Sequence, residues 1–198
     1  MVSSTNVDVL YGLSFCRDPR LWDLIFTALW LMLPAYTANN CATLFGGGRP
    51  LDGERSFFDG KRILGDHKTF RGFFLGVLGG IGMGVVQVIA APYMMAYFTV
   101  PAMPPAVIIA LPLGALAGDA VKSFFKRRLG VESGAMLPVA DQLDFVIGAL
   151  VLGLIAAPQW SLAYYTIPVV VTIVLMTFPL QLFHNMVAVA LGKKKVLW

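Results

Sequence analysis

The chain has 198 residues, of which 58% are hydrophobic and 13% are charged, and its formal net charge is +4. Soluble domains carry a charge on about a quarter of their residues, so this composition excludes an ordinary soluble domain. The alternative environment is a lipid bilayer, which each helix crosses with about 20 mostly apolar residues. We therefore expect an integral membrane protein with a single transmembrane domain over residues 1–198.

Five apolar runs follow one another along the chain. Because backbone polar groups cannot be left unpaired in lipid, we expect each run to be a helix. The predicted helices cover about 22–45, 73–98, 104–121, 143–160 and 162–191. Two polar loops remain, at about 46–72 and 122–140. The predicted fold is an all-α integral membrane protein with five transmembrane helices and two polar cytoplasmic loops.

The lysine and arginine residues lie mostly on one side of the predicted helices. Thirteen of the 15 fall in the two loops and in the C-terminal tail, whereas Arg17 and Arg20 precede the first helix. Cytoplasmic segments of membrane proteins carry such an excess. We therefore expect a multi-pass protein of the cell membrane, with its N-terminus outside and its loops and C-terminus in the cytoplasm. The same rule explains the net charge without a nucleic-acid partner.

Glycine recurs at every fourth position in two of the predicted helices. The positions are Gly72, Gly76, Gly80 and Gly84 in the second helix, and Gly114 and Gly118 in the third. Glycines at this spacing share one helix face and let another helix approach closely. We interpret them as packing positions, either within one chain or between chains, and the oligomeric state stays open.

Charged residues concentrate in two segments. Of the 26 charged residues, ten lie in 49–71 and eight in 119–144. The topology rule explains the lysines and arginines in these segments, but acidic residues contribute little to orientation. The acidic residues therefore indicate a second purpose, which we take to be a binding or catalytic site.

The spacing of the aspartates points to a cation. Asp119 and Lys126 lie seven residues apart on one helix face. Asp141 and Asp144 are three residues apart at the start of the fourth helix, so their carboxylates can converge. Convergent carboxylates near a headgroup boundary suit a hard divalent cation, above all Mg²⁺. The alternative is that these aspartates form salt bridges with Lys126 or Arg127 that close the helix ends.

The first loop supplies cations for an anionic ligand. Lys68 and Arg71 directly precede the glycine-rich helix, where a helix N-terminus adds free N–H groups. Asn39 lies in a polar patch at the end of the first helix, where helix capping is the alternative. The sequence contains no GxSxG, HExxH or P-loop motif. Phosphate-binding cations and metal-binding acids without a nucleophile favour phosphoryl or nucleotidyl transfer, in which positioning and charge neutralisation do most of the catalysis.

Several motifs resemble those of membrane CDP-lipid cytidylyltransferases. They are SFFKRR at 123–128, DQLD at 141–144 and HKTFRG at 67–72. With PAYTANN at 34–40 and five predicted helices, the chain is most similar to the short archaeal branch, the CDP-archaeol synthase family. It departs from the phosphatidate-using branch at Glu132-Ser133, where that branch has a Lys-Asp pair, and this departure favours the archaeal lipid substrate.

The resemblance implies an enzyme with a defined reaction and site. CTP and 2,3-bis-O-(geranylgeranyl)-sn-glycerol 1-phosphate, an isoprenoid ether-lipid phosphate, would give CDP-archaeol and pyrophosphate, with Mg²⁺ as cofactor. The implied metal ligands are Asp119, Asp141 and Asp144, which with Lys126 form the expected catalytic set. The expected substrate-binding residues are Lys68, Arg71, Ser123, Lys126 and Arg127, with Asn39 and Asp66 as weaker candidates.

Other functions stay open on the residues alone. A phosphatidate cytidylyltransferase would share the motifs and use an ester lipid. CDP-alcohol phosphotransferases and prenyltransferases also place aspartates at the membrane, but the DxxD spacing at 141–144 counts against both. A small ion channel or transporter with an acidic vestibule is the alternative that is not an enzyme. Base selectivity for CTP and the number of metal ions are not visible in the sequence.

Overall fold

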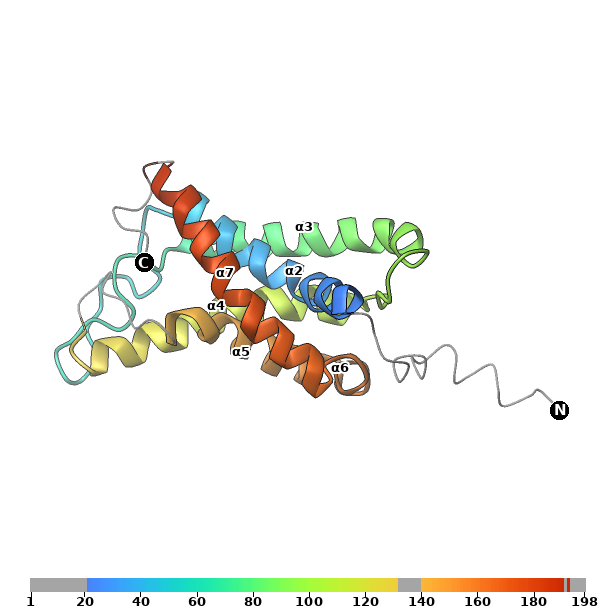
Figure 1. Ribbon diagram of the computed structural model, residues 1–198. Coiled ribbons are helices and arrows are strands. Elements are labelled where there is room, and N and C mark those ends of the chain that lie inside the picture. Colours follow the sequence, from blue (N-terminus) through green and yellow to red (C-terminus); the bar gives the residue numbers. More distant parts are fainter. Residues whose placement is uncertain (1–20, 132–139, 191, 193–198) are drawn as a thin grey trace.

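The computed structural model describes residues 21–131, 140–190 and 192, and within them the chain is all-helical. The helices are α2 (Leu21–Phe45), α3 (Phe70–Met94), α4 (Pro105–Arg128), α5 (Ala140–Ala156), α6 (Pro158–Tyr164) and α7 (Ile167–Ala190) (Figure 1). Four of them, α2, α3, α4 and α7, are long and apolar enough to cross a membrane. The expectation of a helical, multi-pass membrane protein is confirmed, while the count of five crossings stays a prediction.

The helix bounds differ from those expected in several places, two of which lie near the predicted site. α4 continues through 122–128, which we assigned to a loop; this assignment was wrong because hydropathy marks the end of an apolar stretch and not the end of a helix. α3 begins at Phe70, three residues earlier than expected, because the Thr69 side chain accepts a hydrogen bond from the backbone N–H of Gly72 and caps the helix. Residues 132–139 of the predicted second loop lie outside the described residues.

The C-terminal part of the bundle also breaks at different residues. We expected helices over 143–160 and 162–191, whereas α5 ends at Ala156 and a short helix, α6, precedes α7. Pro158 stands at the start of α6, where its missing N–H costs nothing. The interior of the bundle is formed mainly by buried side chains from α2, α4, α5 and α7, including Leu31, Leu111, Phe145 and Ile173.

The glycines of α3 lie where α2 and α4 come closest. A Cβ atom added at Gly76 would lie 2.8 Å from the carbonyl oxygen of Ala38 in α2. One added at Gly80 would meet Pro112 of α4 at 2.5 Å. Real Cβ atoms do not approach other atoms so closely, so the helices could not pack this way with larger residues. The predicted packing face is confirmed, since these glycines pack against neighbouring helices of the chain.

The polar parts of the molecule gather at one end of the bundle. In Figure 1 the loop between α2 and α3 lies beside the end of α4 and the start of α5. Two isolated antiparallel bridges, Pro50 with Thr69 and Ser56 with Arg62, fold this loop back on itself. The loop, the end of α4 and the start of α5 together carry most of the predicted site residues, while Asn39 lies in α2 and Arg71 in α3.

Candidate active site

Three aspartates meet at one lysine. The Lys122 Nζ atom lies 3.1 Å from Asp119 Oδ1, 3.0 Å from Asp141 Oδ1 and 2.6 Å from Asp144 Oδ2. All four side chains are at most 18% exposed. The convergence of Asp141 and Asp144, inferred above from their spacing, is therefore present in the fold, and Asp119, which the resemblance implied as a third ligand, lies with them.

Two further lysines complete this group. Lys68, from the loop before α3, forms an ion pair with Asp119. Lys126, one turn beyond Lys122 on α4, lies 3.0 Å from Asp141 Oδ2. The resulting aspartate–lysine cluster, formed by Asp119, Asp141, Asp144, Lys68, Lys122 and Lys126, has three negative and three positive charges. Since an isolated buried charge is costly, this balance explains how so many ionised groups can share one place.

Close backbone contact between α4 and α5 brings the aspartates together. Gly118 of α4, next to Asp119, lies against the backbone of Asp144 and Gly148 in α5. A Cβ atom added at Gly118 would be 3.0 Å from the Cα atom of Gly148 and closer still to the carbonyl oxygen of Asp144. The absence of side chains at Gly118 and Gly148 therefore sets the separation of the carboxylates.

The oxygen donors of the cluster fit a hard cation in their chemistry, but a lysine ammonium lies between them. Mg²⁺ is usually held by one or two carboxylates together with substrate phosphates and waters, so these carboxylates could supply the protein's share of its ligands. The position of Lys122 Nζ shows that a positive charge is accommodated among them. Within the described residues, no group of three His, Cys, Asp or Glu side chains is arranged to hold a metal ion directly. A divalent ion would have to take the place of the Lys122 ammonium.

The loop that carries Lys68 is organised around a buried aspartate. The Asp52 side chain is fully buried and accepts hydrogen bonds from Arg62 Nη2 at 2.9 Å and from the backbone N–H groups of Leu64 and Gly65 at 3.0 Å each. Burial alone would raise the pKa of this carboxyl, but the hydrogen bonds from Arg62 and the backbone outweigh it and hold the pKa well below its usual range. Asp52 is therefore ionised at neutral pH.

Arg128 fastens the same loop to the end of α4. Its Nη2 atom donates to the carbonyl oxygens of Lys61 and Arg62, at 3.1 and 2.6 Å, and its Nε atom lies 3.0 Å from Asp59. The guanidinium also stacks against Phe57, 4.9 Å from the centre of the ring. These contacts, with the hydrogen bond from Leu51 N to Lys68 O of 2.7 Å, hold Lys68 in reach of Asp119.

Comparison with known proteins identifies the family. A model of the CarS-like family, described as CDP-archaeol synthase, matches residues 21–198. The chain belongs to the CDP-archaeol synthase family. Family members named CDP-archaeol synthase include one from Methanospirillum hungatei, 48% identical over 84% of this chain and all of its own length. Another, from Halobacterium salinarum, is 46% identical over 88% of this chain and 97% of its own.

A solved structure supports the same placement. It belongs to an intramembrane enzyme for archaeal membrane lipids biosynthesis and is similar with a TM-score of 0.68 and 39% sequence identity. The match covers 82% of this chain and 94% of that one. The CDP-archaeol synthase family and the intramembrane fold are therefore supported by both sequence and structure.

The remaining residues that we expected in the site lie around the cluster or away from it. The Ser123 hydroxyl donates to the Asp119 carbonyl oxygen at 2.8 Å, so it is engaged by its own helix. Asp66 pairs with Arg62 at 2.8 Å and is 69% exposed. Arg71 is exposed at the start of α3, and Arg127 follows Lys126 in the last turn of α4.

Asn39 lies in the last two turns of α2, the helix that leads into the loop. Its backbone carbonyl accepts a hydrogen bond from the Thr43 hydroxyl at 3.0 Å, within the helix.

Two important residues were missed as site residues. Lys122 shares the helix face of Asp119 and Lys126, but the sequence offers no reason to choose it over its neighbours as the centre of three carboxylates. Asp52 looks like an ordinary loop aspartate, because its partners Arg62, Leu64 and Gly65 become neighbours only when the loop folds back. The DG pair at 52–53, typical of a turn, is the one sequence signal near it.

Proposed function

We propose that this chain transfers the cytidylyl group of CTP to 2,3-bis-O-(geranylgeranyl)-sn-glycerol 1-phosphate, giving CDP-archaeol and pyrophosphate. The family match over residues 21–198 carries this proposal. The high coverage of relatives named CDP-archaeol synthase supports it. The multi-pass helical fold also fits a substrate whose isoprenoid tails stay in the bilayer while its phosphate reaches a polar site.

In the proposed reaction an oxygen of the lipid phosphate attacks the α-phosphorus of CTP. The bond from the α-phosphorus to the bridging oxygen of the β-phosphate breaks, and pyrophosphate leaves with the electron pair. A phosphate monoester has its second pKa near 6 and is largely dianionic at neutral pH, so the enzyme needs no general base. The absence of a need for a general base agrees with a site composed of aspartates and lysines.

We assign the roles within the site by charge. Asp119, Asp141 and Asp144 would hold Mg²⁺, which supplies charge neutralisation for the departing pyrophosphate. Lys68, Lys126, Arg71 and Arg127 would bind the triphosphate and the lipid phosphate, with Ser123, Asn39 and Asp66 lining the same region. The observed convergence of the three carboxylates on a positive charge supports the assignment of the metal ligands.

Lys122 receives a role that follows from its position. Its ammonium neutralises the three carboxylates in the structure described here. With a divalent ion held by the carboxylates, this ammonium would no longer be needed to neutralise them, since two cations close together repel each other. Lys122 would then add to the phosphate-binding cations.

We also propose the topology expected from the sequence. Four helices suffice in length and composition to cross the membrane, and α5 with 17 residues would provide the fifth crossing. Thirteen of 15 basic residues would then lie in the cytoplasm with the C-terminus and the active site, and the N-terminus would lie outside. A cytoplasmic active site gives CTP direct access.

The test is pyrophosphate release by the detergent-purified protein with CTP and Mg²⁺. The geranylgeranyl ether phosphate is compared with phosphatidic acid at equal concentration. We expect turnover with the ether lipid and none with phosphatidic acid. Equal turnover with both lipids would leave a cytidylyltransferase without the archaeal selectivity, and no turnover with either would refute the proposed reaction.

A further inference from the structure

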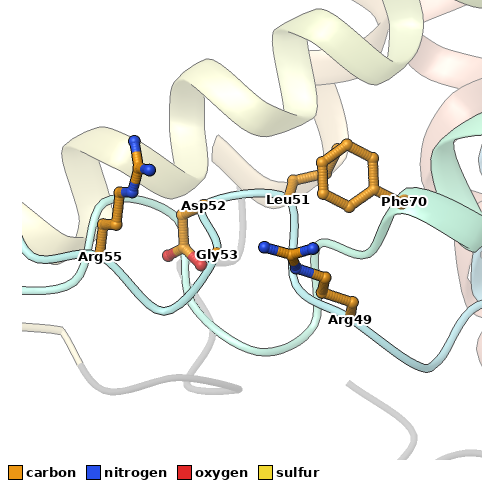
Figure 2. Close-up of a pocket in the computed structure, with 6 residues that line it drawn as sticks. All are labelled: Arg49, Leu51, Asp52, Gly53, Arg55 and Phe70. Carbon is orange, nitrogen blue, oxygen red and sulfur yellow. The ribbon is translucent and has the colours of Figure 1, made fainter.

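A pocket separate from the aspartate–lysine cluster opens in the loop between α2 and α3. It has a volume of about 220 Å³. Its lining residues, shown in Figure 2, are Arg49, Leu51, Asp52, Gly53, Arg55 and Phe70. Arg49 and Arg55 lie on either side of the turn at 52–53, and Phe70 lies beside Leu51. None of the cluster residues contributes to this pocket.

The pocket is strongly positive. Arg49 and Arg55 are both exposed, and neither guanidinium has a hydrogen bond or ion pair with any residue in 21–131 or 140–190. The third charged lining residue, Asp52, does not neutralise them, because its fully buried carboxylate is already bound by Arg62 and backbone N–H groups. A guanidinium matches the oxygens of a phosphate group with paired hydrogen bonds, so two of them at one pocket suit a phosphate-bearing anion.

The size of the pocket limits the anion. Pockets for drug-sized ligands have volumes of about 300–1,000 Å³, and this one is smaller. It would therefore hold a phosphate group with little attached to it, rather than a complete nucleoside triphosphate. Most of any larger ligand would have to lie outside the pocket.

An apolar stripe runs from the pocket along α3. Phe70, which lines the pocket, is followed at four-residue intervals by Phe74 and Leu78, and these three side chains are 44%, 60% and 62% exposed. Residues at this spacing share one helix face. Because α3 is long and apolar enough to span the membrane, this exposed apolar face would contact lipid tails. The phosphate pocket and the lipid-facing stripe therefore meet at Phe70.

The stripe faces away from the aspartate–lysine cluster. Gly76 and Gly80, which pack against α2 and α4, are each two residues from a member of the stripe. Two residues correspond to about 200° around a helix, so the stripe lies on the opposite side of α3 from α4, the helix that carries Asp119. A lipid on this stripe would be separated from the reaction by the body of α3.

We propose that this surface binds one anionic membrane phospholipid that is not a substrate. Its phosphate would lie between Arg49 and Arg55, and one tail would follow Phe70, Phe74 and Leu78 into the bilayer. Charge complementarity selects the occupant, since two unpaired guanidinium groups at the head of an apolar stripe match an anionic headgroup with an attached tail. The proposal does not depend on the cytidylyl transfer proposed above.

The test counts lipids bound to the full-length protein. The protein is delipidated in detergent and titrated with dioleoyl phosphatidylglycerol, and native mass spectrometry measures the bound lipid. We expect one tightly bound lipid on the wild type and binding at least about 10-fold weaker on the R49Q/R55Q variant, because charge-assisted hydrogen bonds are lost. The K193Q/K194Q variant removes the same charge from the C-terminal tail and should bind as the wild type does.

Two further measurements distinguish a bound phospholipid from a bound free phosphate ion. F74A/L78A should weaken lipid binding while the pocket arginines remain, and inorganic phosphate at the same concentration should not displace the lipid. Equal binding by the wild type and R49Q/R55Q, equal loss in K193Q/K194Q, no effect of F74A/L78A, or displacement by inorganic phosphate would each overturn the proposal.

Turnover of the same variants distinguishes the bound lipid from the substrate. R49Q/R55Q should lose the bound lipid and keep its rate of pyrophosphate release at saturating substrates within about twofold of the wild type, given the separation from the reacting groups. Parallel loss of lipid binding and turnover would assign the pocket to the substrate and overturn the proposal. Absence of turnover in the wild type would count against the proposed reaction only, because the lipid count is measured independently.

Discussion

The close approach of α4 and α5 predicts that one added methyl group will disable the enzyme. In Gly118→Ala the new Cβ atom would overlap the backbone carbonyl of Asp144. The neighbouring atom belongs to the helix backbone and cannot rotate aside, so the two helices must separate locally. Asp144 would move away from Asp119, and the set of three carboxylates would open.

The distances between α4 and α5 give the expected size of the loss in activity. Ordinary contact for a Cβ atom begins at 3.4 Å, and reaching it requires α5 to retreat by about 1 Å, a shift that well-packed interiors resist. A misplacement of about 1 Å at a catalytic group can lower the rate about 100-fold. We therefore expect Gly118→Ala to reduce pyrophosphate release about 100-fold while the protein still folds, at a cost of about 1–3 kcal/mol for overpacking.

The matched control makes the same substitution where nothing lies near. A Cβ atom added at Gly82, in the middle of α3, has no atom within 4 Å. Gly82→Ala should keep wild-type turnover and leave stability equal or higher, because alanine favours a helix over glycine by about 1 kcal/mol. Both variants are assayed for pyrophosphate release and for thermal unfolding in detergent. Wild-type activity in Gly118→Ala would refute the argument that backbone contact sets the carboxylate geometry.

Three further predictions concern single side chains. Asp144→Asn should lower pyrophosphate release by at least about 100-fold, and near-normal turnover would remove Asp144 from the proposed metal ligands. Lys122→Gln leaves three carboxylates without their central cation, so Mg²⁺ should raise its unfolding temperature more than that of the wild type; an equal or smaller rise would argue against a metal site there. Asp52→Asn should cost about 1.5–3 kcal/mol of unfolding free energy at pH 7, against at most about 1 kcal/mol for the exposed control Asp59→Asn. Because the pKa of Asp52 is lowered in the folded state, its contribution to the unfolding free energy is complete above about pH 4 and is lost as the pH falls further. The wild type and Asp52→Asn should therefore converge in stability under acid. A constant difference in stability from pH 7 to pH 2 would contradict this explanation.

The aspartates of the site could be predicted because their arrangement is local. Asp141 and Asp144 are separated by less than one turn of a single helix, and the helical period alone places them together. Asp119 could be added because a charged residue at the end of an apolar helix needs a partner. The helical period could not predict the distance between α4 and α5, because this distance depends on the contact between Gly118 and Gly148.

Long-range contacts account for what was missed. Lys68 reaches Asp119 across 51 positions of the chain, and Arg128 binds the carbonyl of Lys61 across 67. Sequence patterns record neighbours within a few residues, so no pattern could assign these partners. Asp52 was overlooked for the same reason, since its role depends on a loop that is closed by contacts at both of its ends.

By itself, the sequence determined that the chain is helical and lies in a membrane, because apolar content and helical period act over short stretches and depend on no distant partner. It also predicted the chemical character of the candidate site, since the aspartates and lysines occur in recognisable local motifs. Only the tertiary structure decided that Lys122 lies among the three carboxylates, that 122–128 continues α4, and that Arg49 and Arg55 share a pocket next to an exposed apolar stripe. These features depend on how separate helices and a folded loop pack against one another, and such packing is specified by the shapes of many side chains together.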